Sequence, residues 1–472
     1  MHRNEEIMEL KNKKALIVGT GKSGMASAGL LKKANAVICL SDSNQEVKKE
    51  DVIQRFEELK KEVPLFHGLS VSEEEIFIGT FPDEELKKFE LAVISPGVPI
   101  DSPLVLKLKE EKIPVIGEIE LAYQFAKGKL VGITGTNGKT TTTALTGEIM
   151  KTWFQEVFVV GNIGIPYTNR TLETTDQSVT VAEISSFQLE TTDEFHPDVS
   201  AVLNITPDHL NRHHTMEVYI DTKLSITKRQ TKDDVCVLNY EDGVLRERAS
   251  QLPCKVVFFS SSRKIENGYY LEDDDIMKNE NGIDTKIVSI HDLKLLGKHN
   301  YENVMAAIAI AEAMGVPMEC IKRAVCEFAA VEHRIEYVAE KQGVKYYNDS
   351  KGTNPDAAIQ GIRAMVRPTL LIGGGYDKGS VYSDWIRSFD GKVRYLVLIG
   401  QTREKIKEEA EACGFHSIIM ADSLEEAVTI CARKANPGDA VLLSPACASW
   451  GMFDNYEQRG NMFKDYVHKL PE

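Results

Sequence analysis

The sequence lacks any long apolar run. Nowhere do about eighteen apolar residues, roughly the length of a membrane-spanning helix, follow one another, so we expect no membrane insertion. The charged amino terminus has no apolar core of the kind that a signal peptide carries. The eight cysteines include no C-x-x-C pair and no regular spacing, which argues against a disulfide framework and against a zinc site. These absences predict a protein of the reducing cytoplasm.

Positive charge is also scarce. Lys and Arg number 56 against 71 Asp and Glu, a formal net charge of −15. A chain with this balance has no electrostatic footprint for a polyanion, so nucleic acid is not an expected partner, although a local basic cleft could bind a phosphorylated small molecule. The hydrophobic fraction of 42% and the charged fraction of 27% are typical of a globular protein rather than a disordered one.

The 472 residues predict about three domains, at roughly 150 residues per domain. Short β-branched runs alternate with helical stretches along most of the chain, a pattern typical of parallel sheets with crossover helices. We therefore expect an α/β fold of three domains, each built around a mainly parallel sheet. The first and third domains are expected to be Rossmann-like and the central one similar to P-loop ATPases. The predicted boundaries are 1–117, 118–330 and 331–472.

The first glycine-rich segment, residues 19–24, fits G-x-G-x-x-G between an expected strand and an expected helix. Glycines at these places let backbone N–H groups approach a phosphate at the amino end of a helix. Asp42 ends the next expected strand, where a carboxylate can accept a hydrogen bond from a ribose hydroxyl. The segment indicates a dinucleotide or a nucleoside diphosphate. A tight turn without a ligand is the alternative.

A second glycine-rich segment, residues 135–141, carries the stronger signal. Backbone N–H groups, the Lys139 ammonium and the Thr140 hydroxyl are the groups that bind the phosphates and Mg²⁺ of a nucleotide. The segment departs from the usual P-loop pattern, because Ile133 stands where that pattern has its first glycine. A glycine-rich loop without a ligand would have to meet all these requirements by coincidence.

Several side chains could bind a metal ion. Glu183 ends a buried-looking strand of the second set, where a carboxylate can hold Mg²⁺, although a charge at the rim of the sheet is the simpler alternative. His209, His213 and His214 have a spacing that would suit zinc. No thiolate and no H-E-x-x-H motif accompanies them, so we do not expect zinc.

The last third of the chain offers further polar groups. Asn303 could face an adenine edge or cap a helix, and Arg334 could bind a phosphate or form a surface ion pair. Residues 348–354 place acid, base and hydroxyl groups at the end of an expected strand, where α/β proteins bind ligands. Cys447 lies among small residues without an evident base, which favours a buried structural thiol over a nucleophile.

Taken together, these segments resemble the ATP-dependent Mur ligases of peptidoglycan synthesis over essentially the whole chain. The matching segments are residues 134–140, 162, 183–190, 204–209, 299–303, 333–334 and 349–351. Residues 95–97, 348–354, 444–449 and 457–460 are similar to the branch that adds D-glutamate. The D-N-P-R motif of the branch that adds diaminopimelate or lysine is absent.

The resemblance implies an activity. ATP would phosphorylate the free carboxylate of UDP-N-acetylmuramoyl-L-alanine (UDP-MurNAc-L-alanine), and the amine of D-glutamate would attack the acyl phosphate to form an amide. The implied cofactors are ATP and Mg²⁺ at two sites, with Lys223 as a carbamate, because an ammonium cannot be a metal ligand. The implied partners are these two small molecules. We expect a monomer that binds neither nucleic acid nor membrane.

The resemblance also assigns roles to individual residues. Those expected to act in catalysis are Lys139, His209, Lys223 and Lys351. Those expected to bind ATP are Gly135, Thr136, Asn137, Gly138, Lys139, Thr140, Thr141, Asn303, Arg334 and Asp349. Those expected to bind metal are Thr140, Glu183, His209 and Lys223. Those expected to bind the UDP-substrate are Lys22, Ser23, Asp42, Ser43, Gly97, Asn162, Ser185 and Gln188. Those expected to bind D-glutamate are Thr353, Lys378, Ser449 and Tyr456, the last at a place where relatives can carry phenylalanine.

Three other functions are compatible with parts of the sequence. An NAD-dependent dehydrogenase would use residues 19–42 but leave the second glycine-rich segment and the third domain without a role. A ligase similar to folylpolyglutamate synthetase would share the ATP chemistry, but the UDP-type first domain disfavours it. An ATP-binding regulatory protein would need no second metal site, so the presence of His209 and Lys223 opposes it.

Overall fold

A computed structural model describes residues 10–471 except 163, 296, 330–331 and 378. The predicted boundary at 330 and 331 and the predicted ligand residue Lys378 thus lie outside the described residues. Contacts divide the chain into two compact units. One comprises Met1–Glu272, Met277–Ile287 and Val304–Val325, and the other Asp273–Ile276, Val288–Asn303 and Cys326–Glu472.

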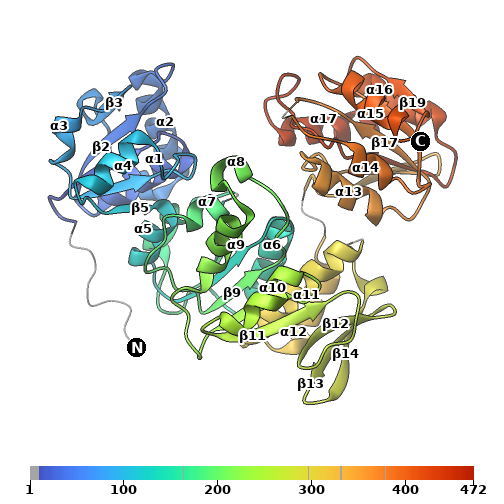
Figure 1. The fold of residues 1–472 in the computed structure, drawn as a ribbon, viewed down its shortest axis with the longest axis horizontal. Helices are drawn as coiled ribbons and strands as arrows, with labels where there is room; N and C mark the ends of the chain where they lie inside the picture. Colours follow the sequence, from blue (N-terminus) through green and yellow to red (C-terminus); the bar gives the residue numbers. More distant parts are fainter. Residues whose placement is uncertain (1–9, 163, 296, 330–331, 378, 472) are drawn as a thin grey trace. The chain divides into compact units, whose positions relative to one another are not determined.

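The strands form three sheets (Figure 1), and each sheet is mainly parallel among the pairs that the structure describes. The expected α/β class with three domains is confirmed. None of the helices in the described part of the chain combines the length and the apolar character needed to cross a bilayer.

The first sheet, blue in Figure 1, has the strand order β3-β2-β1-β4-β5 and is parallel throughout. Its strands are β1 (Lys14–Val18), β2 (Val37–Asp42), β3 (Ile76–Ile78), β4 (Leu91–Ile94) and β5 (Val115–Gly117). The connecting helices are α1 (Lys22–Lys33), α2 (Lys49–Glu62), α3 (Asp83–Leu86) and α4 (Pro103–Glu110). Strand order reverses between β1 and β4, so ligand-binding loops are expected at the carboxyl ends of these two strands.

Strand β1 shows why this sheet is covered on both faces. Ala15 and Ile17 pack into one apolar core, and Leu16 and Val18 pack into another. Alternate side chains of a strand point to opposite faces, so a strand that is apolar at every position must be buried on both sides. The run of apolar residues in the sequence therefore required helices above and below the sheet.

The second sheet has nine strands in the order β14-β13-β12-β11-β10-β9-β6-β8-β7. These strands are β6 (Lys129–Thr134), β7 (Val157–Gly161), β8 (Val179–Glu183), β9 (Val199–Val202), β10 (Val235–Asn239), β11 (Lys255–Ser260), β12 (Gly268–Glu272), β13 (Asp275–Glu280) and β14 (Ile283–Ser289). The helices of this part are α5 (Glu118–Phe125), α6 (Lys139–Lys151), α7 (Ser186–Leu189), α8 (Leu210–His213), α9 (Met216–Leu224), α10 (Gly243–Arg248), α11 (Lys298–Ala313) and α12 (Met318–Glu327). The parallel strands β6, β8 and β9 place their carboxyl ends at one edge, next to the start of α6.

The third sheet has the order β15-β16-β20-β17-β18-β19 and is parallel except for the hairpin of its first two strands. Its strands are β15 (Glu336–Lys341), β16 (Val344–Asn348), β17 (Thr369–Gly373), β18 (Val393–Leu398), β19 (Ile418–Met420) and β20 (Ala440–Leu443). Its helices are α13 (Pro355–Ala364), α14 (Ser383–Arg387), α15 (Arg403–Ala412), α16 (Leu424–Lys434) and α17 (Tyr456–His468). Strands β16 and β20 are direct neighbours, so their carboxyl ends lie together.

Helix α5 holds two buried carboxylates in its first turn. Glu120 accepts hydrogen bonds from the backbone N–H groups of residues 193, 194 and 195, at 2.8, 3.1 and 3.1 Å. One oxygen of Glu118 accepts from the backbone N–H and the hydroxyl of Thr168, at 2.7 and 2.8 Å, and its other oxygen is buried without a partner. Burial raises the pKa of Glu118, although the bonds from Thr168 oppose this. The charged form is therefore the costly one at this position.

We expect Glu118→Gln to stabilise the protein at about pH 8 and to change little near pH 4. Because the pKa of Glu118 in the folded state lies above its unfolded value, ionisation favours the unfolded chain at every pH above the unfolded pKa, and folding is unaffected below it. Each unit of elevation is worth about 1.4 kcal/mol. Urea denaturation midpoints at several pH values measure the effect. Glu148→Gln, on an exposed position of α6, is the matched control, and equal midpoints for Glu118→Gln and the unmodified protein at the higher pH would contradict the prediction.

Candidate functional site

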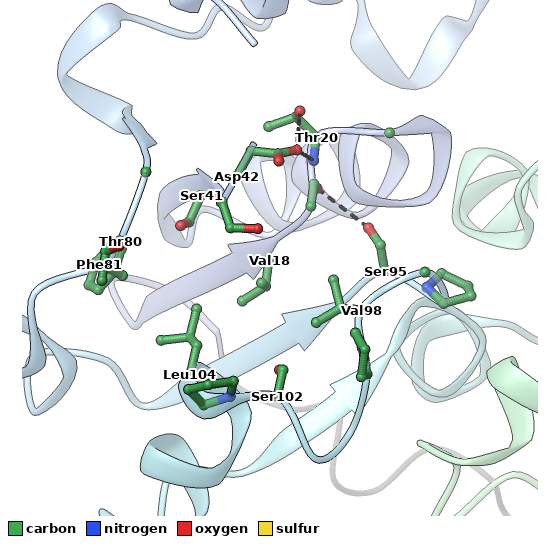
Figure 2. A pocket seen from close by; sticks show the side chains of 18 of the residues that line it. Val18, Thr20, Ser41, Asp42, Thr80, Phe81, Ser95, Val98, Ser102 and Leu104 are labelled. Carbon is green, nitrogen blue, oxygen red and sulfur yellow. Dashed lines mark hydrogen bonds between the residues drawn. The ribbon is translucent and has the colours of Figure 1, made fainter. Parts of the chain in front are cut away.

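A cleft of about 750 Å³ lies at the carboxyl ends of β1, β2 and β4. Figure 2 shows Thr20 and Asp42 on one side of it and Ser95, Val98 and Ser102 on another. The walls also include five residues that the sequence assigned to the UDP-substrate, namely Lys22, Ser23, Asp42, Ser43 and Gly97. The point of strand reversal thus carries an open site of the size of a nucleotide-type ligand.

The glycine-rich loop of this cleft is held in one shape. Asp42 accepts hydrogen bonds from the backbone N–H and the hydroxyl of Thr20, at 2.9 and 2.7 Å (Figure 2). Burial raises the pKa of Asp42, but the hydrogen bonds from Thr20 and Asn44 and the charge of Arg55 outweigh it, so the net pKa is lowered. A Cβ atom on Gly24 would lie 1.9 Å from the carbonyl oxygen of Gly19. Only glycine therefore allows the helix to approach the loop this closely.

A second loop connects β6 to α6 and contains the predicted nucleotide-binding residues. Gly135 and Gly138 have φ values of +149° and +86°, which other residues rarely adopt. The backbone N–H of Asn137 donates to the side chain of Asn204 at 2.8 Å, and that side chain donates back at 3.1 Å. The Lys139 ammonium donates to the carbonyl oxygens of Gly135 and Thr136, both at 2.9 Å. The loop thus has the strand-to-helix geometry of a phosphate site.

Lys223 lies beneath this loop, on α9. Its side chain is almost fully buried, and its amine donates to the same carbonyl oxygen of Gly135 that Lys139 uses, at 2.8 Å. Burial, and then the charge of Lys139, lower the pKa of Lys223 well below its ordinary value, while Asp208 opposes the shift. The ring of Tyr219 packs against the amine, 4.8 Å from its centroid. Lys223 therefore favours the neutral amine, which is the nucleophilic form.

Glu183 ends β8 at the carboxyl edge of the same sheet. It pairs in register with Ile133 of β6 and with Gly161 of β7. Its carboxylate is buried and accepts a hydrogen bond from the Asn162 amide at 3.0 Å. The sequence-predicted Ser185 and Gln188 follow directly and form a capping box at the start of α7. The structure thus gathers Glu183, Asn162, Ser185 and Gln188 at one edge, separate from the lining of the first cleft.

The three histidines predicted as a weak zinc candidate do not form a cluster. His209 begins α8 with φ of +53°, and its half-exposed ring lies against Phe187 with centroids 4.8 Å apart. His213 is buried and bonds to the Ser186 hydroxyl at 2.9 Å, whereas His214 is exposed. In the described part of the chain the one group of three possible metal ligands is Glu332, His333 and Glu336. The Lys464 ammonium forms ion pairs with both carboxylates of this group, Glu332 and Glu336.

The second compact unit contains the other predicted nucleotide residues. Asn303 is buried on α11 and donates to the Asn300 side chain at 3.1 Å. The Nε of Arg334 is buried and has no hydrogen-bond partner in the described structure. A buried donor of this kind is suited to bind an anion such as a phosphate. Asp349 follows β16 and accepts from the Ser444 hydroxyl at 2.6 Å. Burial raises the pKa of Asp349 to about 7, against the opposing effects of Ser444, Arg334 and Arg459.

Of the described residues predicted to bind D-glutamate, Thr353 follows β16, and Ser449 and Tyr456 follow β20. The carboxyl ends of these two strands are adjacent. The Lys351 ammonium is 5.4 Å from the ring centroid of Tyr456. Ser449 is buried, and Thr353 is half-buried two residues after Lys351. Three of the four predicted residues thus lie near the adjacent carboxyl ends of β16 and β20.

Cys447 is a structural thiol in the described structure. Its sulfur lies 3.1 Å from the Tyr382 hydroxyl and 3.3 Å from that of Thr402. Burial raises the pKa of the thiol, although both hydroxyls oppose this. A nucleophilic cysteine needs the opposite shift, so the sequence-based preference for a buried thiol agrees with the structure.

Sequence reasoning assigned no role to Tyr219, whose hydroxyl lies 3.1 Å from that of Thr136 in the loop predicted to bind a nucleotide. Its place four residues before Lys223, hence on the same face of one helix, was the available signal. It also assigned no role to Arg459, although the residue lies in a segment that supported the resemblance. Its complete burial is visible only in the folded chain.

Three family models match the chain. The model of the MurD-like N-terminal domain of Mur ligases matches residues 13–117, that of the Mur ligase middle domain residues 133–311, and that of the Mur ligase glutamate ligase domain residues 333–447. The three matches follow the order of the three sheets.

Relatives and solved structures agree with these models. A protein of Lachnoclostridium phytofermentans named UDP-N-acetylmuramoylalanine–D-glutamate ligase is 55% identical over 98% of this chain and 100% of its own length. The protein of the same name from Clostridioides difficile is 45% identical, with the same coverage. Among solved structures, Thermotoga maritima MurC is similar with a TM-score of 0.60 at 18% identity, covering 96% of this chain and 99% of its own. Thermotoga maritima MurF in complex with ADP has a TM-score of 0.57 at 17% identity, covering 98% and 97%. The chain belongs to the Mur ligase family.

Proposed function

We propose that this protein is an ATP-dependent ligase that adds D-glutamate to UDP-N-acetylmuramoyl-L-alanine in peptidoglycan precursor synthesis. The observation that carries the proposal is identity of 55% over 98% of the chain to a relative named for this activity. The geometry supports it, because a nucleotide-type cleft, a phosphate loop and a polar strand edge occur on the three sheets.

We infer one role for each domain. Residues 1–117 would bind the UDP part of the substrate, residues 118–330 would bind ATP, and residues 331–472 would bind D-glutamate. Lys22, Ser23, Asp42, Ser43 and Gly97 line the cleft suited to the UDP part. Asn162, Ser185 and Gln188 would contact the muramoyl-alanine part from the edge where Glu183 lies. Asn303, Arg334 and Asp349 would bind the adenosine and a phosphate of ATP.

The first chemical step would be phosphoryl transfer. A carboxylate oxygen of UDP-MurNAc-L-alanine attacks the γ-phosphorus of ATP, the bond to the bridging oxygen breaks, and ADP leaves. Negative charge spreads over the phosphoryl oxygens, so donors fixed around them stabilise the transition state. The backbone of residues 135–141 and the ammonium groups of Lys139 and Lys351 would supply these donors.

The second step would form the amide. The amine of D-glutamate attacks the carbonyl carbon of the acyl phosphate, phosphate leaves, and the nitrogen loses a proton, which the departing phosphate can accept. Thr353, Ser449 and Tyr456 offer hydroxyl donors for the carboxylates of D-glutamate, and Lys378 would add a cation. Thr353 and Ser449 belong to loops that follow β16 and β20, so the third sheet defines their positions.

The residues beside the phosphate loop fit Mg²⁺. Oxygen donors are the ligands that Mg²⁺ prefers, and the Thr140 hydroxyl and the buried Glu183 carboxylate are of this kind. His209 and Lys223 would complete a second site, with Lys223 as a carbamate. Mg²⁺ held by these residues would neutralise charge on the phosphoryl oxygens. The lowered pKa of Lys223 supports the carbamate, because carbon dioxide reacts with a neutral amine.

We further propose that the protein acts in the cytoplasm as a monomer. Its partners would be ATP and two soluble small molecules. We do not include nucleic acid among these partners, because the chain has fewer positive than negative charges.

Phosphate release tests the proposed activity directly. We expect the protein to release phosphate from ATP when UDP-MurNAc-L-alanine and D-glutamate are both present, and not when L-glutamate, L-alanine or meso-diaminopimelate replaces D-glutamate. Lys139→Ala should lower the rate by at least about a hundredfold, because it removes a cation from the phosphoryl site. Arg170→Lys, on an exposed pair with Glu173, is the control. Release with another amino acid would move the assignment to a different member of the family, and none with any acceptor would refute ligase activity.

Carbamate formation at Lys223 can be measured without turnover. We expect protein equilibrated with ¹³C-bicarbonate to show a carbamate resonance that Lys223→Met lacks, because burial lowers the pKa of this amine and so favours its reactive free form. Lys228→Met, which alters an exposed lysine of the same region, should keep the resonance. Removal of dissolved carbon dioxide should lower activity, and bicarbonate should restore it. Identical spectra for Lys223→Met and the unmodified protein would contradict the assignment.

A further inference from the structure

Arg459 is a fully buried cation on helix α17. Its exposed fraction is 0%, which places it among the largest completely buried side chains in the described structure. Burying a guanidinium is costly, because the charge loses its hydration. A residue with this cost needs compensating contacts.

Three hydrogen bonds of Arg459 join two separate loops. Its Nε donates to the Ser350 hydroxyl at 2.9 Å, and one terminal nitrogen donates to the Ser350 carbonyl at 2.7 Å. The other terminal nitrogen donates to the Cys447 carbonyl at 3.1 Å. Ser350 follows β16 and Cys447 follows β20. One planar group therefore fixes the distance between the loops that leave two neighbouring strands.

The first turn of α17 is tied to the same group. The Ser350 hydroxyl, which accepts from Arg459, donates to the carbonyl oxygen of Tyr456 at 2.8 Å. The ring of Tyr456 in turn lies near the Lys351 ammonium. A lysine could not reproduce this arrangement, because an ammonium lacks the flat fork that reaches three acceptors in fixed directions.

No carboxylate forms an ion pair with Arg459 in the described residues. Burial lowers its pKa to about 10, while Cys447 and Asp349 oppose the shift, so the group stays charged near neutral pH. Its three hydrogen-bond acceptors in the described structure are neutral oxygens. Asp349 therefore offsets the positive charge without bonding to it, and the hydrogen bonds of the guanidinium hold loops that the proposed function assigns to an amino acid with two carboxylates.

A third loop packs closely against the same place. A Cβ atom on Gly375 would lie 2.3 Å from the Ala448 carbonyl oxygen and 3.4 Å from a terminal nitrogen of Arg459. The Tyr376 N–H donates to that carbonyl at 2.9 Å. The loop after β17 is thus positioned through the loop that Arg459 holds.

We propose that Arg459 is a positioning residue for the acceptor amino acid. It holds the loops carrying Lys351, Thr353 and Ser449 in register, and its charge attracts the acceptor carboxylates from below the site. The assignment of the acceptor site rests on the proposed function, whereas the coupling of the loops rests on the hydrogen bonds alone.

Two substitutions separate geometry from charge. Arg459→Gln removes both, and we expect at least about a tenfold rise in the KM for D-glutamate, since small displacements of binding groups have effects of this size. Arg459→Lys keeps the charge and should give a smaller rise. The KM for UDP-MurNAc-L-alanine should stay within twofold in both, because its cleft lies on the first sheet. Arg394→Lys, which alters a pair with Asp439 at the start of β18, is the control.

Hydrogen exchange provides a readout that does not depend on turnover. Arg459→Gln should lose amide protection at residues 349–353 and 446–450, and Arg394→Lys should not. If Arg459→Gln does not fold, Ser350→Ala removes one acceptor of the fork, and both readouts apply to it. An unchanged KM for the acceptor, or unchanged exchange at the two loops, would overturn the proposal. If the unmodified protein uses a different amino acid, the KM comparison is made with that one. If it uses none, the proposed function fails and exchange alone decides the role of Arg459.

Discussion

The carbonyl oxygen of Gly135 accepts hydrogen bonds from the amines of Lys139 and Lys223, and the proposed nucleotide site is built around this shared contact. The loop reaches this geometry because Gly135 adopts a φ of +149°, where a side chain would meet Leu203. Two ammonium groups on one oxygen repel each other, and burial favours the neutral form of Lys223. The fold thus favours a neutral amine next to the loop proposed to bind phosphate. A carbamate there would replace a repelling charge with oxygen donors.

The third domain also buries ionisable groups, here one acid and one base. Asp349 and Arg459 are both buried, each influences the pKa of the other, and neither forms an ion pair with its neighbour in the described structure. Hydrogen bonds to neutral groups, Ser444 for the one and Ser350 and Cys447 for the other, satisfy them instead. Such networks restrict the loops around them, because each member must keep its partner to avoid an unsatisfied buried polar group. The same loops carry the residues proposed to bind the acceptor.

Sequence reasoning located the strands, the two glycine-rich loops and the polar segments after strands, because these depend on local patterns. It interpreted Asp42 as an acceptor for a ribose hydroxyl, and that role stays a prediction. In the structure the same carboxylate accepts two hydrogen bonds from Thr20 and thereby shapes the loop. It attached no role to Glu120, which binds three backbone N–H groups more than seventy residues away along the chain. No local pattern encodes a contact of that separation.

The sequence by itself determined the fold class, the order of the domains and the residue types at the phosphate loop, since alternating apolar runs and glycine spacing act over a few neighbouring residues. Tertiary structure alone decided which groups share an environment. Lys223 meets Gly135 across 88 residues of chain, and Arg459 meets Ser350 across 109. The burial and pKa of Lys223 and Arg459 and the register of their loops follow from these long-range contacts. Desolvation depends on everything that packs around a group and not on its neighbours in sequence.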